Sequence, residues 1–177
     1  MEFLIIVDAQ NDFITGKLAV PGAKEVRENI HMELLRTSAA VLFTRDIHDP
    51  DTYALSIEGK RIPEHCTTQT SGSEISRTFL FMFGHLGGYF PPVVEKSTFA
   101  YMDWRTILQF FAHSESVDGI TLVGFCTDIC VLSNAIVLRN LFPNIPIRVK
   151  ADCCAGSTPE LHEAALKIMA ANLIEIV

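Results

Sequence analysis

The chain alternates short, uninterrupted apolar runs with longer segments of helical periodicity, and this alternation restricts the fold more than any other feature. Apolar runs without polar interruption are typical of strands that are buried on both faces of a parallel sheet. We predict strands at residues 3–7, 39–44, 93–96, 120–123, 145–149 and 173–176, and helices at 22–37, 103–113, 130–141 and 157–171. The pattern predicts an α/β fold, a three-layer α/β/α sandwich with a central, mainly parallel sheet.

The length and charge of the chain limit its organisation and its partners. A chain of 177 residues can bury one substantial core, so we expect residues 1–177 to form a single domain. Its formal net charge of −7 argues against nucleic acid or an anionic membrane as the main partner. No basic segment precedes the first apolar run, and the five cysteines are unevenly spaced. We therefore expect a protein without a signal peptide, with reduced thiols, in the cytoplasm.

Three reactive residue types stand at or just after predicted strand ends: Asp8, Lys96 and Cys130. Parallel strands place their carboxyl ends at one edge of the sheet, where ligands of open α/β sheets bind. Thr127 and Asp128 are good N-cap residues, so Cys130 is expected in the first helical turn, where the helix dipole favours a thiolate. The alternatives are that Asp8 caps a loop and that Cys130 is a small buried hydrophobic residue.

The segment of residues 46–72 lacks sustained periodicity and is rich in Pro, Gly, Ser and Thr. A loop longer than about 12–15 residues inside a compact domain is usually functional. It contains the acids and imidazoles Asp46, His48, Asp49, Asp51, Glu58, Glu64 and His65. Two imidazoles with carboxylates can enclose a divalent metal ion, although solvated surface acids beside two ordinary histidines would give the same pattern.

Three separated motifs resemble those of the isochorismatase-like cysteine hydrolases, most closely their nicotinamidase/pyrazinamidase branch. They are Val-Asp-Ala-Gln-Asn-Asp-Phe at 7–13, Glu-Lys-Ser at 95–97 and Gly-Phe-Cys-Thr-Asp-Ile-Cys-Val at 124–131. Their order and spacing match over essentially the whole chain. The resemblance implies the isochorismatase-like, Rossmann-like version of the α/β/α sandwich.

The resemblance also implies roles for individual residues. The catalytic triad would be Asp8, Lys96 and Cys130. The backbone N–H groups of Cys126 and Cys130 would form the oxyanion hole, with a cis peptide bond between Phe125 and Cys126.

The nicotinamidase branch adds a metal site and a ring-binding pocket to the implied features. The ligands of one divalent metal ion would be Asp46, His48, Glu58 and His65, with zinc expected first and iron or manganese as alternatives. Pocket walls would be Phe13, Ile62 and Phe99. Ile62 stands where these enzymes have Trp or Phe, and Phe99 where they often have Tyr. Because both residues would be pocket walls, these departures concern substrate preference more than the chemistry of the reaction.

The function that the resemblance implies is hydrolysis of the linear C–N amide bond of nicotinamide, through a thioester, to nicotinate and ammonia in pyridine nucleotide salvage. The partner would be this small-molecule amide, and the resemblance leaves homo-oligomers and pyrazinamide acceptance open. One alternative is another carboxamide or N-carbamoyl amidohydrolase of the family. Others are a metallohydrolase in which Cys130 is only core, and a non-catalytic metal-binding module. Isochorismate hydrolysis is not expected, because that branch does not use a Cys nucleophile. The run at 79–83 could be a core strand, a pocket lid or a subunit contact.

Overall fold

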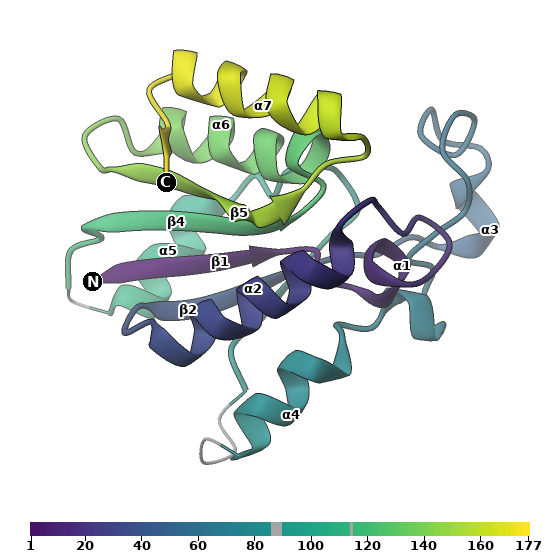
Figure 1. Cartoon of the computed structure of the whole chain (residues 1–177), viewed down its shortest axis with the longest axis horizontal. Coiled ribbons are helices and arrows are strands. Elements are labelled where there is room, and N and C mark those ends of the chain that lie inside the picture. The colour runs from purple at the N-terminus through teal and green to yellow at the C-terminus, as the bar shows by residue number, and fades with distance from the viewer. Residues whose placement is uncertain (86–89, 114) are drawn as a thin grey trace.

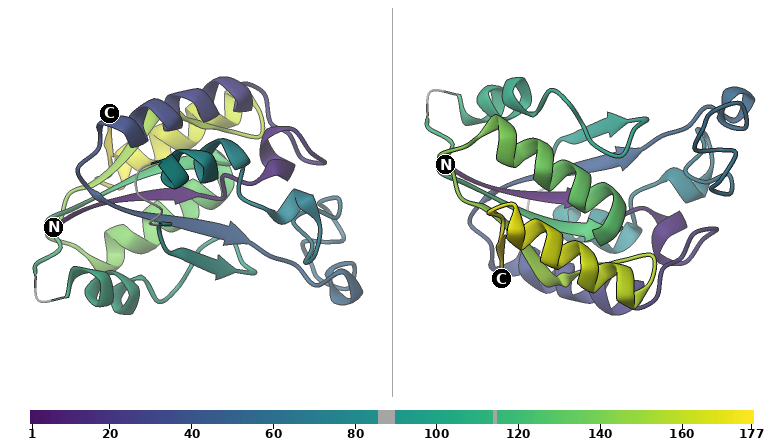
Figure 2. Two further views of the ribbon diagram at one scale, coloured as in Figure 1. Left: turned by 90° about the horizontal axis from the view of Figure 1, so that it is seen from below. Right: turned by 90° about the horizontal axis from the view of Figure 1, so that it is seen from above.

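The computed structural model describes residues 1–85, 90–113 and 115–177 as a three-layer α/β/α sandwich (Figures 1 and 2). The described strands form one six-stranded sheet in the order β3-β2-β1-β4-β5-β6, and every pairing is parallel. The strands are β1 Glu2–Val7, β2 Ala40–Asp46, β3 Val93–Lys96, β4 Gly119–Phe125, β5 Ile147–Ala155 and β6 Glu175–Ile176. The predicted fold class is confirmed, and the sheet is entirely rather than mainly parallel.

The central strand β1 divides its side chains between two cores, which explains its uninterrupted apolar run. Phe3, Ile5 and Val7 pack with α5 Trp104–Ala112, α6 Leu132–Leu141 and α7 Pro159–Ala171 on one face. Leu4 and Ile6 pack with α2 Ala23–Arg36 and α4 Arg77–His85 on the other. Within the described ranges, no helix has both the length and the apolar character that a membrane span requires.

The aromatic run at 79–83 forms part of helix α4 and covers the outer part of the sheet. Phe79 is fully buried, and its ring centroid lies 6.0 Å from that of Phe43 on β2. Phe83 contacts the same ring, whereas Phe81 is 67% exposed. The side chains at 80 and 82 lie outside the described residues. The segment therefore contributes to the core as a helix, a choice that a short apolar run alone does not decide.

The strand order reverses between β1 and β4, and this reversal positions the candidate site. From β1 the chain proceeds outward to β2 and β3, and then returns to β4 on the other side of β1. Ligands of open α/β sheets bind at such a switch point, outside the carboxyl ends of the strands. The short elements α1 Asn11–Ile14, α3 Pro50–Tyr53, η1 Ser71–Ser73 and η2 Thr127–Val131 lie in the connections near this edge.

The start of the helix after β4 differs from the prediction. A π-helical turn, η2, precedes α6, and Cys130 lies in that turn. Neither predicted cap residue acts as one: Thr127 Oγ1 is 2.8 Å from His162 Nδ1, and Asp128 accepts a hydrogen bond of 2.7 Å from the Ser157 N–H. These side chains pair with the segment that begins α7, so tertiary contacts override the local capping preference.

Candidate active site

The structure brings Asp8, Lys96 and Cys130 into contact at the carboxyl edge of the sheet. Lys96 Nζ lies 2.6 Å from Asp8 Oδ2 and 3.8 Å from Cys130 Sγ. All three residues are buried, with exposed fractions of 7% or less. A carboxylate, an ammonium and a thiol that are 34 or more residues apart in sequence thus form one cluster.

A threonine that the sequence analysis did not single out fixes the carboxylate. Thr44 on β2 is fully buried, and its hydroxyl donates to Asp8 Oδ1 at 2.6 Å while accepting the Asp8 N–H at 3.1 Å. Asp8 itself adopts a left-handed backbone conformation with φ of 47°. The available signal was a hydroxyl in the otherwise apolar stretch 39–44, on the strand beside β1.

Burial and the shared ammonium set the pKa values of the cluster. Burial raises the pKa of Asp8 above the usual carboxyl range, although the charge of Lys96 opposes the shift. Burial alone would lower the pKa of Lys96, but the neighbouring Asp8, Cys130 and Asp46 outweigh it and raise that pKa. Lys96 is therefore cationic at neutral pH.

The Cys130 thiol behaves differently from the sequence-based expectation. Burial raises its pKa well above that of an ordinary thiol, Asp8 adds to the shift, and Lys96 only partly offsets it. The expected thiolate preference at the helix start is thus wrong for the free site, because desolvation outweighs the nearby cation. For this sulfur to act as a nucleophile, a base would have to remove its proton.

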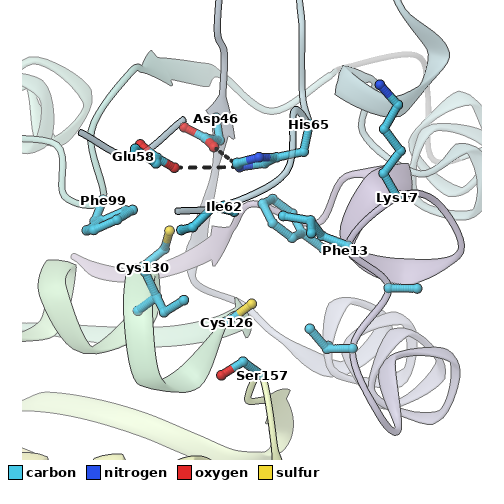
Figure 3. Close-up of a pocket in the computed structure, with 14 residues that line it drawn as sticks. Phe13, Lys17, Asp46, Glu58, Ile62, His65, Phe99, Cys126, Cys130 and Ser157 are labelled. Carbon is cyan, nitrogen blue, oxygen red and sulfur yellow. Dashed lines mark ion pairs between the residues drawn. The ribbon is translucent and has the colours of Figure 1, made fainter. Parts of the chain in front are cut away.

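A cavity of about 380 Å³ opens beside Cys130. Figure 3 shows Cys130 and Cys126 on one side of it and Asp46, Glu58 and His65 on the other. Its apolar walls include the three residues that the sequence analysis named as pocket walls, which are Phe13, Ile62 and Phe99. The peptide bond between Phe125 and Cys126 is cis, as the resemblance implied. A small, mostly apolar cavity with few convergent polar groups is typical of a small-molecule site.

Four predicted metal ligands converge beside this cavity, and three of them, Asp46, Glu58 and His65, line its far wall. Asp46, His48, Glu58 and His65 each offer one ligand atom, and these atoms lie within 4.8 Å of one another. Asp46 Oδ2 is 2.9 Å from His48 Nε2 and 3.3 Å from His65 Nε2. Glu58 Oε1 lies 3.7 Å from both imidazole nitrogens. Two imidazoles and two carboxylates are a donor set that suits a divalent metal ion.

The orientation of the His65 imidazole supports this assignment. Its Nδ1 lies 2.9 Å from the Pro63 carbonyl oxygen, which can only accept, so we assign the proton to Nδ1. The lone pair of Nε2 then faces the cluster. Tyr53 packs against both imidazole rings, and its hydroxyl lies 3.2 Å from the same Nδ1. Hydrogen bonds from the outer ring nitrogen are the usual support for a metal-binding histidine, and the four residues fit such an ion.

Two polar residues of the 7–13 motif hold this cluster from the β1 side. The Gln10 side-chain amide donates to the Asp46 carbonyl at 2.7 Å and accepts the Asp46 N–H at 2.7 Å. Asp12 accepts the N–H of Cys66, next to His65, at 2.8 Å. Both are buried. The sequence analysis predicted the metal ligands but not these supporting contacts, for which the only signal was membership of the motif.

Asn134 on α6 connects the Cys130 turn to the loop after β3. Its Nδ2 donates to the carbonyls of Cys130 at 2.8 Å and Phe99 at 3.0 Å. Its Oδ1 accepts the Tyr101 N–H at 3.0 Å and the Trp104 Nε1–H at 2.9 Å. The side chain is fully buried and satisfied. An amide four residues after the thiol, in a helix that is apolar almost all round, was the signal for this role.

Comparisons with known proteins agree with this architecture. The family model described as Isochorismatase domain matches residues 2–177. A Bacillus subtilis (strain 168) protein, described as an uncharacterized isochorismatase family protein PncA, is 28% identical over 181 residues, which cover 96% of this chain and 94% of that one.

Solved structures show the same fold. The pyrazinamidase/nicotinamidase from Streptococcus mutans UA159 is 26% identical with a TM-score of 0.81, and the match covers 100% of both chains. The Pyrococcus horikoshii pyrazinamidase in complex with zinc is 24% identical with a TM-score of 0.77, covering 99% of this chain and 98% of that one. The yeast nicotinamidase Pnc1p bound to the inhibitor nicotinaldehyde is 20% identical with a TM-score of 0.81, covering 100% of this chain and 99% of that one.

Proposed function

This chain belongs to the isochorismatase family, and we propose that within it residues 1–177 form a single-domain, metal-dependent cysteine amidohydrolase that converts nicotinamide to nicotinate and ammonia. The family and the neighbouring nicotinamidases and pyrazinamidases support an amidohydrolase. The observation that carries the proposal is the placement of Lys96 Nζ, 2.6 Å from Asp8 and 3.8 Å from Cys130, beside a cavity whose other side holds four metal-type ligands.

Asp8 acts as the base in the proposed reaction. It takes the Cys130 proton, and the sulfur forms a bond to the carboxamide carbon. Asp8 then gives that proton to the leaving amine, the C–N bond breaks, and ammonia departs from a thioester. Asp8 next deprotonates a water molecule, whose oxygen bonds to the thioester carbon. The C–S bond breaks, the carboxylic acid leaves, and Asp8 returns the proton to the Cys130 sulfur. A raised carboxyl pKa suits this role, because a base works best when its pKa approaches the operating pH.

Lys96 and two backbone N–H groups stabilise the charge that moves during these steps. Lys96 contacts both Asp8 and Cys130, so its ammonium stays beside the negative charge on either partner. The N–H groups of Cys126 and Cys130 would receive the oxyanion, where the loss of one donor typically costs about 3–4 kcal/mol in the transition state.

The residues at the far wall orient the substrate ring. A divalent metal ion held by Asp46, His48, Glu58 and His65, with zinc as the first expectation, would supply a Lewis acid for the lone pair of a ring nitrogen. Phe13 and Phe99 line the cavity between this wall and Cys130, where they would contact the ring and exclude water. This arrangement sets the carboxamide over the sulfur.

The experiment is an ammonia-release assay on nicotinamide with the Cys130→Ala variant. We expect no turnover and an unchanged metal content, because the thiol is the nucleophile but not a ligand. Cys154→Ala is the matched control, since this buried cysteine on β5 does not line the cavity. Turnover retained in Cys130→Ala would overturn the covalent route and favour a metallohydrolase in which the thiol only packs.

The alternative within the family is another carboxamide or N-carbamoyl amidohydrolase. Three of the four donor residues line the substrate cavity, which favours a substrate that carries a lone pair at a fixed distance from its amide. A wild-type enzyme that hydrolysed an N-carbamoyl amino acid faster than nicotinamide would favour the alternative.

A further inference from the structure

A second cavity of about 430 Å³ adjoins the first one. Three residues, Glu58, Ile62 and Phe99, line both cavities. The remaining walls of the second are Ile57, Arg61, Ser97 and Thr98. We call this second cavity the outer chamber. The three shared residues belong to the walls of both the outer chamber and the candidate substrate pocket, and we call them the partition.

Ile62 is one of the two apolar members of this partition. An indole at the same position would occupy considerably more space than the aliphatic isoleucine side chain. Figure 3 shows Ile62 between Glu58 and Phe13, next to Cys130, so a larger side chain there would fill the boundary between the two cavities. Phe99, the other apolar member of the partition, is 40% exposed.

The backbone on both sides of the partition is anchored, so the outer chamber is part of the fold. The Ile62 carbonyl accepts the Tyr53 hydroxyl at 3.2 Å, and Tyr53 is buried against the metal-type cluster. On the opposite side, the Phe99 carbonyl accepts from the Asn134 amide, and Thr98 Oγ1 donates to the Ala100 carbonyl at 2.8 Å. These hydrogen bonds therefore hold the backbone on both sides of the partition in place.

The lining of the outer chamber indicates what would occupy it. Ile57, Ile62 and Phe99 provide apolar surface, and Ile57 is 79% exposed. In the part of the chain that the structure describes, no carboxylate pairs with Arg61. A guanidinium that is free of an ion pair can stack on an aromatic ring. Apolar walls with a stacking cation suit a flat aromatic group.

We propose that the substrate site continues past Ile62 and Phe99 into the outer chamber, and that the enzyme accepts aromatic carboxamides enlarged by a second fused ring. The inference rests on the proposed amidohydrolase function and specifies its substrate class. Ligand pockets for drug-sized molecules measure about 300–1,000 Å³, and the two cavities together lie in the upper part of this range.

Quinoline-3-carboxamide is the probe that tests this proposal. It keeps the ring nitrogen and the carboxamide in the same 1,3 relation as nicotinamide and adds a benzo ring on the edge beside the nitrogen. With one water molecule it would give quinoline-3-carboxylic acid and ammonia, by cleavage of the same C–N bond. The added ring would extend from the side of Glu58 into the outer chamber, which Glu58 also lines.

The experiment compares kcat/KM for nicotinamide and quinoline-3-carboxamide by ammonia release. We expect the wild-type enzyme to hydrolyse both, with values within about tenfold of each other. Ile62→Trp should lower the quinoline-to-nicotinamide ratio of kcat/KM at least about tenfold, because the indole would fill the boundary between the two cavities. Ile57→Trp changes a residue that lines the outer chamber but not the substrate pocket. It should lower kcat/KM for quinoline-3-carboxamide and leave kcat/KM for nicotinamide unchanged. The control Ile168→Trp, on an exposed part of α7, should leave the ratio unchanged.

The outcomes separate this inference from the proposed function. Turnover of nicotinamide without turnover of the bicyclic amide, or a ratio that Ile62→Trp leaves unchanged, overturns the extended site alone. A wild-type enzyme that hydrolyses neither compound overturns both proposals. Turnover of the bicyclic amide with the expected loss in Ile62→Trp supports both.

Discussion

Replacement of Asn134 by Leu should destabilise the protein and slow the reaction together. Leucine has the same branched skeleton with larger methyl ends, so the change removes hydrogen bonds without creating a cavity. Four partners lose their contacts: the carbonyls of Cys130 and Phe99, the Tyr101 N–H and the indole N–H of Trp104. The indole donor is fully buried, and an unsatisfied buried donor costs about 1–3 kcal/mol.

The expected total for Asn134→Leu is about 2–4 kcal/mol in the free energy of unfolding, since the exposed partners can regain water. The value of kcat/KM should also fall, because Asn134 ties the Cys130 carbonyl to the loop that carries Phe99. Urea unfolding measures the first effect and ammonia release the second. Asn140→Ala is the matched control: this exposed amide lies on the same helix and donates to the Ile136 carbonyl at 2.7 Å. We expect it to cost less than about 1 kcal/mol.

A double-mutant cycle makes the reasoning refutable. In the Asn134→Leu background the Trp104 indole has no acceptor, so Trp104→Phe should remove an orphaned donor and cost less than it does in the wild type. We expect a coupling energy of about 1–2 kcal/mol. Equal costs in both backgrounds, or a loss for Asn134→Leu no larger than for Asn140→Ala, would refute the role of Asn134.

Three further predictions concern the base, the metal site and the thiol. Thr44→Val removes the hydroxyl that donates to Asp8, so kcat/KM should fall about tenfold, or about 1.4 kcal/mol, with metal content unchanged. Thr121→Val on β4 is the control, and equal losses of kcat/KM in both variants would count against a role for the Thr44–Asp8 contact. Gln10→Leu frees the Asp46 backbone and should weaken metal binding about 10–100-fold in a chelator competition titration. Asn11→Leu, at a neighbouring amide that donates to the Ser71 carbonyl, should leave metal binding unchanged. Burial raises the pKa of the Cys130 thiol, so its thiolate fraction is small at neutral pH and grows as pH rises. The rate of Cys130 alkylation by iodoacetamide, followed by peptide mass spectrometry, should therefore keep increasing above about pH 8.5. A rate that reached its plateau below that pH would contradict the raised pKa.

The sequence predicted the features of this protein that depend on local pattern. Strands buried on both faces leave a continuous apolar run, and the residue at the end of such a run marks the carboxyl edge of the sheet. Asp8 and Lys96 could therefore be grouped before any coordinates. The metal-type cluster was also foreseeable, because its four residues lie within one loop of irregular composition.

The features that the sequence did not predict depend on partners far along the chain. Asp128 is a good local cap residue, yet it accepts hydrogen bonds from Ser157, 29 residues away. The thiol pKa was misjudged for a related reason: the helix start is visible in the sequence, but the burial of Cys130 arises only when β1, β3 and α6 pack around it. The outer chamber, likewise, is formed by two loops that the fold brings together from either side of β3.

The electrostatics of the cluster explain how a buried thiol with a raised pKa can still react. Burial disfavours the charged forms of both Asp8 and Cys130, which would oppose the loss of a proton to solvent. Transfer of the proton from Cys130 to Asp8 is different, because one negative charge disappears from the carboxylate as another appears on the sulfur. Lys96 contacts both atoms, so the net charge of the group and its pairing with the ammonium stay the same. The desolvation that raises each pKa separately therefore largely cancels in the transfer between them, so the burial of this site is compatible with the proposed role of Asp8 as the base.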